Sequence, residues 1–168
     1  MFGLAGCSDS KIVDQQAAAE AALTLLGETL GGPNIIHDLG YLESGLSGSL
    51  VQLVICNEIV GWIQSFLAPV VIDTETVPLD LIDDVGLDGQ YLSSDHTLRH
   101  YREHWYPTVL DRGNHEQWIS KGGKTLGERV AEQVDRILQL YEIMPLPENV
   151  MREIHAVVQR AEAMTMLE

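Results

Sequence analysis

The residues of this 168-residue chain whose types are best suited to chemistry gather in one stretch, Asn34–Gly48. An apolar pair, Ile35 and Ile36, is followed at once by polar and aromatic side chains spaced by glycines: His37, Asp38, Gly40, Tyr41, Glu43, Ser44, Gly45 and Gly48. The apolar pair is too short for a helix and predicts a buried strand that ends in a polar loop. Such loops carry the chemistry of α/β folds, although an ordinary solvated surface loop has the same composition.

Tyr41 and Glu43 stand two residues apart in this loop and predict a site for an organic cation. An aromatic face attracts a quaternary ammonium or a protonated amine, and a neighbouring carboxylate adds Coulomb attraction. We therefore take Tyr41 and Glu43, together with His37 at the end of the strand, as candidate substrate-binding residues. The sequence assigns no residue a catalytic role.

A second polar loop, which contains Cys7, Ser8 and Asp9, follows the small-residue stretch Phe2–Gly6. These three residues are candidates for lining the same site. A cysteine with His37 as its base could form a nucleophilic dyad. No oxyanion-hole signature accompanies it, however, and a small cysteine at a strand end commonly serves packing.

Three histidines, His96, His100 and His104, recur at four-residue spacing and would share one face of a helix from Asp95 to Trp105. Two histidines four residues apart can ligate one metal, but the outer pair lies about 12 Å apart along a helix axis, too far for a single ion. No cysteine pair and no H-E-x-x-H motif accompanies them. The sequence therefore predicts no metal site here and favours histidines that pack against acidic side chains elsewhere.

Two successive strand–loop–helix units must position the polar loops. The first has a strand near residues 2–6 and a helix that Asp14 caps. The second has a strand near residues 34–37 and a helix that opens with a capping box at Ser49. Repetition of this plan predicts parallel strands, with Cys7 and His37 at one edge of the sheet.

The helix that follows Ser49 is apolar on nearly all sides, which predicts cover on both faces. Asn57 and Glu58 interrupt its middle and need hydrogen-bond partners or a wet groove. These and other polar residues make it a core helix rather than a membrane span.

Beyond residue 69 the pattern predicts helices alone. Helix starts are expected at Pro78, Asp95, Asn114 and the Thr125–Glu128 capping box, whose helix runs to about Ile143, and a last amphipathic helix follows Pro147. The prediction is therefore an α/β part, residues 1–69, and a helical part, residues 70–168.

Composition limits the classes of partner. The chain has 25 acidic and 10 basic residues and a formal net charge of −15. This charge disfavours nucleic acid and anionic membrane surfaces and suits a cationic ligand. Cys7 and Cys56 are the two cysteines and make no disulfide framework, which favours a reducing cytoplasm. Met1 is followed by no basic segment, so no signal peptide is predicted.

Several segments, in order, resemble the trimethylamine methyltransferase family of corrinoid-dependent methyltransferases, which includes members that demethylate glycine betaine. The segments are Gly6–Lys11, Asn34–His37, Leu42–Leu46, Gln52–Glu58 and His96–Pro107. The resemblance extends from Phe2 to about Tyr141, and several long matches in the right order are far more specific than any single motif above.

The resemblance implies the C-terminal portion of a (β/α)₈ TIM barrel, followed by a helical C-terminal extension. It also implies transfer of a methyl group from a methylated or quaternary amine to the Co(I) corrinoid (cobalamin) of a separate protein, with no cofactor bound directly by this chain. The sequence starts at an uncapped strand, and we expect it to be the C-terminal piece of a longer protein. Because an open barrel exposes strand edges, we expect the isolated chain to form homo-oligomers.

Family members that use trimethylamine carry pyrrolysine, and the resemblance places that position near Cys7. The sequence contains no pyrrolysine. This points either to the branch that uses quaternary amines or to a chain that begins close to such a residue. The alternative function, from another class, is a non-catalytic module that binds a protein partner through the His-rich helix, residues 95–105.

Overall fold

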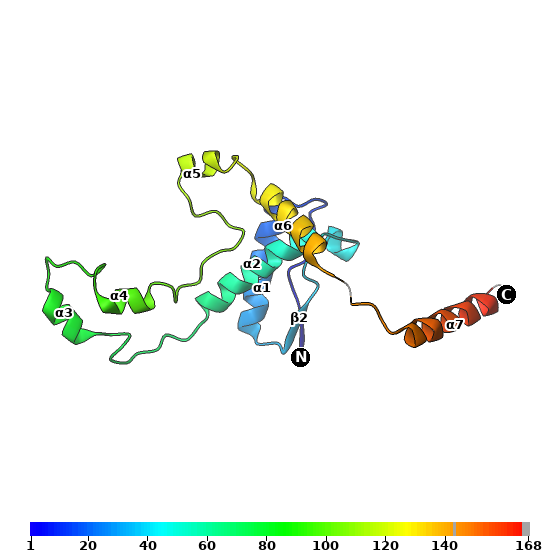
Figure 1. Ribbon diagram of the computed structural model, residues 1–168, viewed down its shortest axis with the longest axis horizontal. Helices are drawn as coiled ribbons and strands as arrows, with labels where there is room; N and C mark the ends of the chain where they lie inside the picture. Colours follow the sequence, from blue (N-terminus) through cyan, green and yellow to red (C-terminus); the bar gives the residue numbers. More distant parts are fainter. Residues whose placement is uncertain (143, 166–168) are drawn as a thin grey trace. The chain divides into compact units, whose positions relative to one another are not determined.

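The computed structural model of the chain describes residues 1–142 and 144–165 (Figure 1). These residues fall into two compact units divided between Asp135 and Arg136. The first part of the first unit contains strands β1 (Phe2–Leu4), β2 (Ile35–His37), β3 (Tyr41–Leu42) and β4 (Ser47–Gly48), and helices α1 (Gln15–Gly31) and α2 (Leu50–Phe66). A 3₁₀ turn, η1 (Glu43–Gly45), connects β3 to β4. The described structure is thus mixed α/β and mostly helical.

Strands β1 and β2 are parallel, as the repeated strand–loop–helix plan predicts. Phe2 pairs with Ile35 and Leu4 with His37, so both strands end at the same edge. The connection between them is α1, which begins after Asp14, whose side chain accepts a hydrogen bond from the Ala17 N–H at 3.0 Å. Its end at Gly32 has a φ of 72°, a left-handed conformation that glycine adopts without strain.

Helices α1 and α2 pack against each other, and small side chains permit the close approach. Ala17 and Ala21 of α1 are fully buried, and the Gln52 side chain of α2 donates from Nε2 to the Ala17 carbonyl at 3.1 Å. The core that forms around this pair also receives Val109 and Val130 from the later part of the chain. The polar loops after β1 and β2 are therefore fixed to a two-helix support.

Helix α2 is exposed along part of its apolar surface, contrary to the prediction of cover on both faces. Ile55, Ile59 and Ile63 are buried, whereas Trp62 and Phe66 are 48% and 73% exposed. Within the described residues, the buried positions of α2 belong to the same core cluster as Ala21 and Leu25 of α1 and Val109 of the later segment. No helix among residues 1–142 and 144–165 combines the length and the hydropathy that crossing a bilayer requires.

After α2 the described residues form helices and connecting segments without strands. The helices are α3 (Leu79–Val85), α4 (Asp95–His100), α5 (His115–Ser120), α6 (Leu126–Leu140) and α7 (Glu148–Thr165). The predicted boundary between residues 1–69 and 70–168 stays a prediction, and the predicted helix end at Ile143 lies outside the described residues. In the second unit, α7 exposes the apolar side chains Ile154 and Val157.

Helix α4 is shorter than predicted, since it ends at His100 rather than Trp105. Trp105 stacks on Trp62 of α2, with ring centroids 6.0 Å apart and an interplanar angle of 6°. Pro107 also disfavours a helical residue before it. His104 therefore does not share a helix face with the other two histidines.

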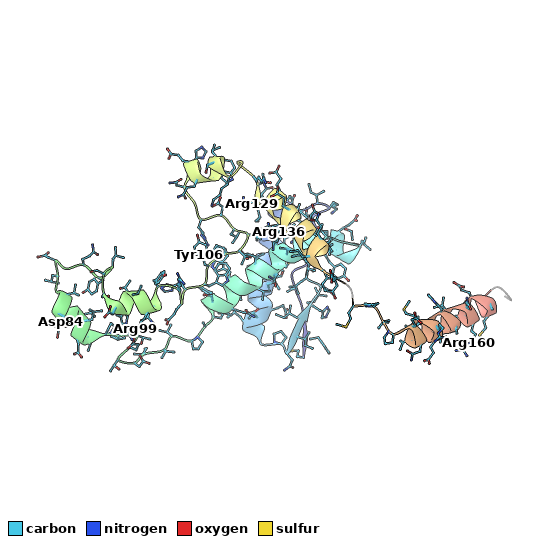
Figure 2. The ribbon with its side chains drawn as sticks, viewed as in Figure 1. Asp84, Arg99, Tyr106, Arg129, Arg136 and Arg160 are labelled. Atoms are coloured by element: carbon cyan, nitrogen blue, oxygen red, sulfur yellow. The ribbon has the colours of Figure 1, made fainter. Side chains whose placement is uncertain are left out.

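Helix α6 is tied to the preceding loop by Arg129, which Figure 2 labels. Its guanidinium donates from Nε to the Val109 carbonyl at 3.1 Å and from a terminal nitrogen to the Lys124 carbonyl at 2.6 Å. Thr125 and Glu128 form the predicted reciprocal cap, because the Glu128 carboxylate accepts from the Thr125 N–H at 2.7 Å and the Thr125 hydroxyl oxygen accepts from the Glu128 N–H at 3.3 Å.

Candidate functional site

The two predicted polar loops meet at the edge where β1 and β2 end. The Ser8 N–H donates to the Tyr41 carbonyl at 3.1 Å, the Glu43 N–H donates to the Ser10 carbonyl at 2.9 Å, and the Ser44 N–H donates to the Ser8 carbonyl at 3.1 Å. Three backbone hydrogen bonds therefore join segments that are more than thirty residues apart in the sequence. The structure brings Ser8 and Asp9 beside the Asn34–Gly48 loop.

Glu20 of α1 holds the first loop in place. Its Oε2 accepts from the Ser8 hydroxyl at 2.6 Å and from the Asp9 N–H at 2.9 Å. The hydrogen bonds from the Ser8 hydroxyl, the Gln16 amide and the Asp9 N–H lower the pKa of the Glu20 carboxyl, so the carboxylate is kept charged. The Asp9 carboxylate in turn accepts from the Ser44 hydroxyl at 2.5 Å, which links the two loops through their side chains.

The second loop concentrates unusual backbone conformations. Asp38, Glu43 and Ser44 have φ values of 75°, 52° and 54°, and they are the non-glycine residues with positive φ in the described part of the chain. Such conformations cost free energy and persist where the surroundings enforce them, often at ligand sites. The antiparallel pair β3–β4 closes this loop, with Tyr41 opposite Gly48 and Leu42 opposite Ser47.

The structure leaves the Tyr41 and Glu43 side chains available for a ligand. Tyr41 is 43% exposed, and Glu43 is half-buried at the start of η1. Within residues 1–142 and 144–165, the Glu43 carboxylate takes part in no hydrogen bond or ion pair. His37 is engaged locally, because its Nδ1 lies 2.8 Å from the Asp38 carboxylate and its ring meets Phe2 edge-on.

Cys7 and Cys56 are both free thiols, and they differ in environment. Cys7 is half-buried in the first loop, and in the described residues no hydrogen bond joins it to His37. Cys56 of α2 is fully buried and donates to the Gly6 carbonyl at 3.3 Å. Burial raises the pKa of the Cys56 thiol, so this cysteine packs and anchors the loop as a neutral group.

The edge formed by these loops is acidic, since the carboxylates of Asp9, Glu20, Asp38 and Glu43 belong to it or support it. An open carboxylate, an exposed aromatic ring and an excess of negative charge favour a small organic cation over an anion. The sequence missed Glu20, Asp38 and Ser44 as supporting residues. The partners of Glu20 and Ser44 could not be foreseen, because Glu20 reaches back from a helix and Ser44 acts across thirty-five residues.

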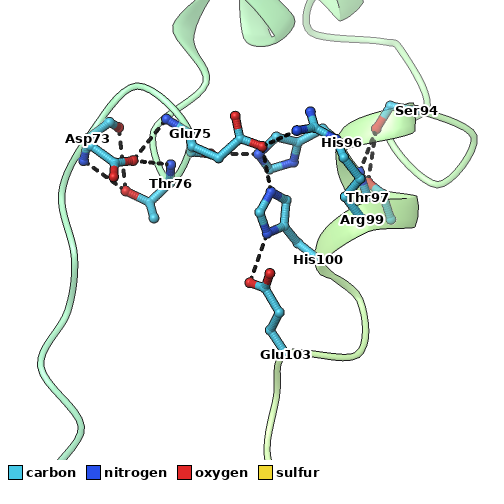
Figure 3. A network of polar contacts seen from close by, with 9 residues as sticks. All are labelled: Asp73, Glu75, Thr76, Ser94, His96, Thr97, Arg99, His100 and Glu103. Carbon is cyan, nitrogen blue, oxygen red and sulfur yellow. Dashed lines mark hydrogen bonds and ion pairs between the residues drawn. The ribbon is translucent and has the colours of Figure 1, made fainter.

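The histidines that the sequence singled out belong to a different place. His96 and His100 of α4 contact Glu75, on the segment before α3, in two ways (Figure 3). His96 Nε2 lies 2.6 Å from the backbone carbonyl oxygen of Glu75, whereas His100 lies beside the Glu75 carboxylate. His100 Nε2 lies 2.7 Å from Glu75 Oε1, and its Nδ1 lies 2.8 Å from a Glu103 oxygen. The hydrogen bonds that His100 donates to the Glu75 and Glu103 carboxylates raise the pKa of His100, and the bond from His100 lowers the pKa of Glu75.

With this geometry established, comparison with known proteins identifies the family. The model of the trimethylamine methyltransferase family matches residues 3–165 of this chain. The chain belongs to the trimethylamine methyltransferase family.

Three relatives illustrate the match. The chain is 34% identical over 157 residues to the trimethylamine methyltransferase MttB of Desulfitobacterium hafniense, covering 94% of this chain and 32% of that protein. It is 30% identical over 155 residues to MttB of Methanosarcina barkeri, covering 92% and 31%. It is 32% identical over 118 residues to the glycine betaine methyltransferase of Desulfitobacterium hafniense, covering 69% and 25%.

The chain thus spans about a third of the length of the trimethylamine methyltransferases that it matches. The predicted resemblance to this family is confirmed over nearly the whole chain. The roles of His37, Tyr41, Glu43, Cys7, Ser8 and Asp9 stay predictions.

Proposed function

We propose that this chain forms the C-terminal part of a methyltransferase that moves a methyl group from a methylated amine to the Co(I) corrinoid of a separate protein. The observation that carries the proposal is the family match over residues 3–165, in which the relatives are named as methyltransferases of trimethylamine and glycine betaine. The acidic loop edge after β1 and β2 supports an amine as the substrate.

The proposed fold of the whole protein is a TIM barrel to which β1, α1, β2 and α2 contribute consecutive units. The parallel pairing of β1 with β2 across α1 supports this assignment. The exposed apolar side chains Phe2 and Ile35 support it as well, because the strands of a closed barrel are flanked and covered on both sides. Self-association of the isolated chain and a cytoplasmic location stay predictions.

The proposed task of the loop edge is to hold the cation and to aim one methyl group. A quaternary ammonium needs no proton at its nitrogen during the transfer, because the amine that departs is neutral once the methyl group has left. Tyr41 and Glu43 hold the positive charge, and His37 orients the rest of the substrate. The corrinoid of the partner protein is the methyl acceptor.

The alternative, a module that binds a protein partner through residues 95–105, has less support. Two of its three histidines, His96 and His100, are already engaged with Glu75 of the same chain. This intramolecular use leaves His104 alone for a partner.

The experiment that tests the proposed reaction uses the full-length protein that contains this chain, with cob(I)alamin as the methyl acceptor. We expect glycine betaine or trimethylamine to convert the absorption spectrum of cob(I)alamin into that of methylcobalamin. The unmethylated amines glycine and ammonia are the matched controls. If no methylated amine produces the change, and the protein's own corrinoid partner does not restore it, the proposed reaction is wrong.

Replacing Glu43 with glutamine in that protein keeps the shape of the side chain and removes its charge. We expect binding of a quaternary ammonium to weaken by about 1–3 kcal/mol, because the cation loses its carboxylate partner. Isothermal titration calorimetry with glycine betaine measures the difference.

The matched control is Glu116→Gln on α5, where an exposed carboxylate is likewise neutralised outside the loop edge. It should leave the affinity unchanged. Equal affinities of Glu43→Gln and wild type would mean that the acid of the loop is structural and that other residues hold the cation.

A further inference from the structure

Glu75, His96 and His100 place three metal-ligating groups together, a grouping that the proposed methyl transfer does not use. One ligand atom from each side chain lies within 4.8 Å of the other two. His96 and His100 are half-buried on α4, and Glu75 comes from the segment before α3, twenty-one residues before His96. We propose that these three residues form a binding site for a divalent transition metal, with Zn²⁺ as the best-suited ion.

The chemistry of the three donors matches Zn²⁺. Zinc takes imidazole nitrogen and carboxylate oxygen at about 2.0–2.2 Å, and two histidines with one glutamate make up a known set of protein ligands. At tetrahedral angles these bonds place neighbouring ligand atoms about 3.3 Å apart. His100 Nε2 and Glu75 Oε1 are 2.7 Å apart, and the remaining separations reach no more than 4.8 Å. Bringing the widest of these separations to about 3.3 Å requires side-chain shifts that total no more than about 1.5 Å.

The helix register supplies the pair of histidines. His96 and His100 are separated by one turn of α4, and their ring centroids lie 4.5 Å apart. The i, i+4 spacing is the arrangement by which a helix presents two imidazoles to one ion. His104 takes no part, because α4 has ended before it. The distance between the outer two of the three histidines, which is too long for one ion, therefore does not apply to this site.

A second carboxylate, that of Glu103, orients the imidazole ring of His100 in the way that is common for histidine ligands of metals. The Nδ1 of His100 lies 2.8 Å from Glu103 Oε2, on the side of the ring opposite Nε2 (Figure 3). In metal sites the second ring nitrogen of a histidine ligand commonly donates to a carboxylate, which fixes the tautomer and raises the basicity of the ligating nitrogen. The Glu103–His100 pair reproduces this arrangement.

The proposed metal position opens on one side onto a cavity. A cavity of about 590 Å³ borders two of the three residues, Glu75 and His96, and its wall also includes Asp80 and Asp95. Three protein ligands leave the fourth position of a tetrahedral zinc ion free for water, and this cavity gives it room. The acidic wall would also attract a divalent cation.

Arg99 competes for the same carboxylate, since one of its terminal nitrogens donates to Glu75 Oε1. A metal at this position therefore has to displace the guanidinium from that oxygen. Removal of Arg99 should therefore strengthen metal binding if the three residues form a metal site. If they form only a network of ion pairs, the same removal would weaken that network.

Zn²⁺ binding can be measured by titrating the full chain with Zn²⁺ in competition with a chromophoric chelator. We expect one Zn²⁺ per chain for wild type, at least tenfold weaker binding for His96→Gln and for Glu75→Gln, and unchanged binding for His104→Gln, the matched control. Arg99→Gln should bind Zn²⁺ several-fold more tightly than wild type. Co²⁺ in place of Zn²⁺ should give visible absorption bands in wild type and not in His96→Gln.

Two results would overturn the proposal. One is a wild-type chain that takes up no Zn²⁺, and the other is a His96→Gln chain that binds it as wild type does. The higher Zn²⁺ affinity expected for Arg99→Gln cannot result from misfolding, because a misfolded chain does not acquire a tighter single site. Unchanged or weaker binding by Arg99→Gln would also count against the site.

Discussion

Replacing Glu58 with alanine is expected to lower the free energy of unfolding by about 3–5 kcal/mol. The Glu58 side chain is 5% exposed in the middle of α2. Its Oε1 accepts from the N–H groups of Thr108, Val109 and Leu110 at 2.7, 2.9 and 3.1 Å, and its Oε2 accepts from the Thr108 hydroxyl at 2.6 Å. Without the carboxylate, three backbone donors beside the core lose their acceptor.

The loss can be measured by urea unfolding and located by amide hydrogen exchange. The amides of Thr108, Val109 and Leu110 should lose protection first, because they are the donors that Glu58 satisfies. Asn57→Ala is the matched control, since Asn57 is the exposed neighbour on the same helix and should change stability by no more than about 0.5 kcal/mol. Equal midpoints for the two variants would show that the carboxylate does not hold the loop.

The same contact predicts a dependence on pH. Burial raises the pKa of the Glu58 carboxyl, but the hydrogen bonds from the Thr108 hydroxyl and from the three N–H groups outweigh it, and the pKa lies below its ordinary value. A group whose pKa is lowered by folding stabilises the folded state above its unfolded pKa, about 4.3 for glutamate, and this contribution is lost as the pH falls through the folded value. The stability gap between wild type and Glu58→Ala should therefore narrow below about pH 4.3.

Local signals in the sequence predicted the starts of three helices correctly. Asp14, Ser49 and Asn114 accept hydrogen bonds from the N–H three residues onward, as capping side chains do. The parallel pairing of residues 2–4 with 35–37 also followed from the order of elements. These features depend on neighbours in the sequence or on connection rules, and both can be read from the order of residues.

Contacts across long separations could not be predicted in this way. The sequence showed that Glu58 needs a partner, but the partner lies fifty residues away in a loop without regular structure. Glu75 reaches His96 and His100 in the same manner, with no spacing signal. The early end of α4 likewise depends on Trp105 packing against Trp62, a tertiary contact that overrides the helical pattern.

The loop that carries Tyr41 and Glu43 was placed correctly beside its strand, while its conformation was not foreseen. Positive φ at a glycine can be expected, but Glu43 and Ser44 adopt it as well. The short pair β3–β4 that closes the loop has two residues in each strand, too few for a sequence pattern to reveal.

Gly40 is the position in this loop where substitution should matter most. It is buried with a φ of 84°, and its carbonyl accepts from the Ser49 N–H at 2.9 Å just before α2. A Cβ at Gly40 would lie 2.9 Å from Leu53 Cβ, 3.0 Å from Leu53 Cα and 3.1 Å from Leu53 N. Two of these atoms are helix backbone, which cannot move aside without disturbing α2.

We expect Gly40→Ala to destabilise the chain by about 2–5 kcal/mol, from about 1–2 kcal/mol for a left-handed non-glycine residue and the remainder from the clash. Gly45→Ala is the matched control in the same loop: its φ is 89°, and a Cβ there meets nothing within 4 Å. The control should lose only the free energy of placing a non-glycine residue at positive φ. The difference in unfolding free energy between the two variants therefore measures how closely the loop packs against α2. Equal urea midpoints for both would mean that the loop can lift from the helix at no cost, and the contact with Leu53 would then not be what holds Tyr41 and Glu43 in position.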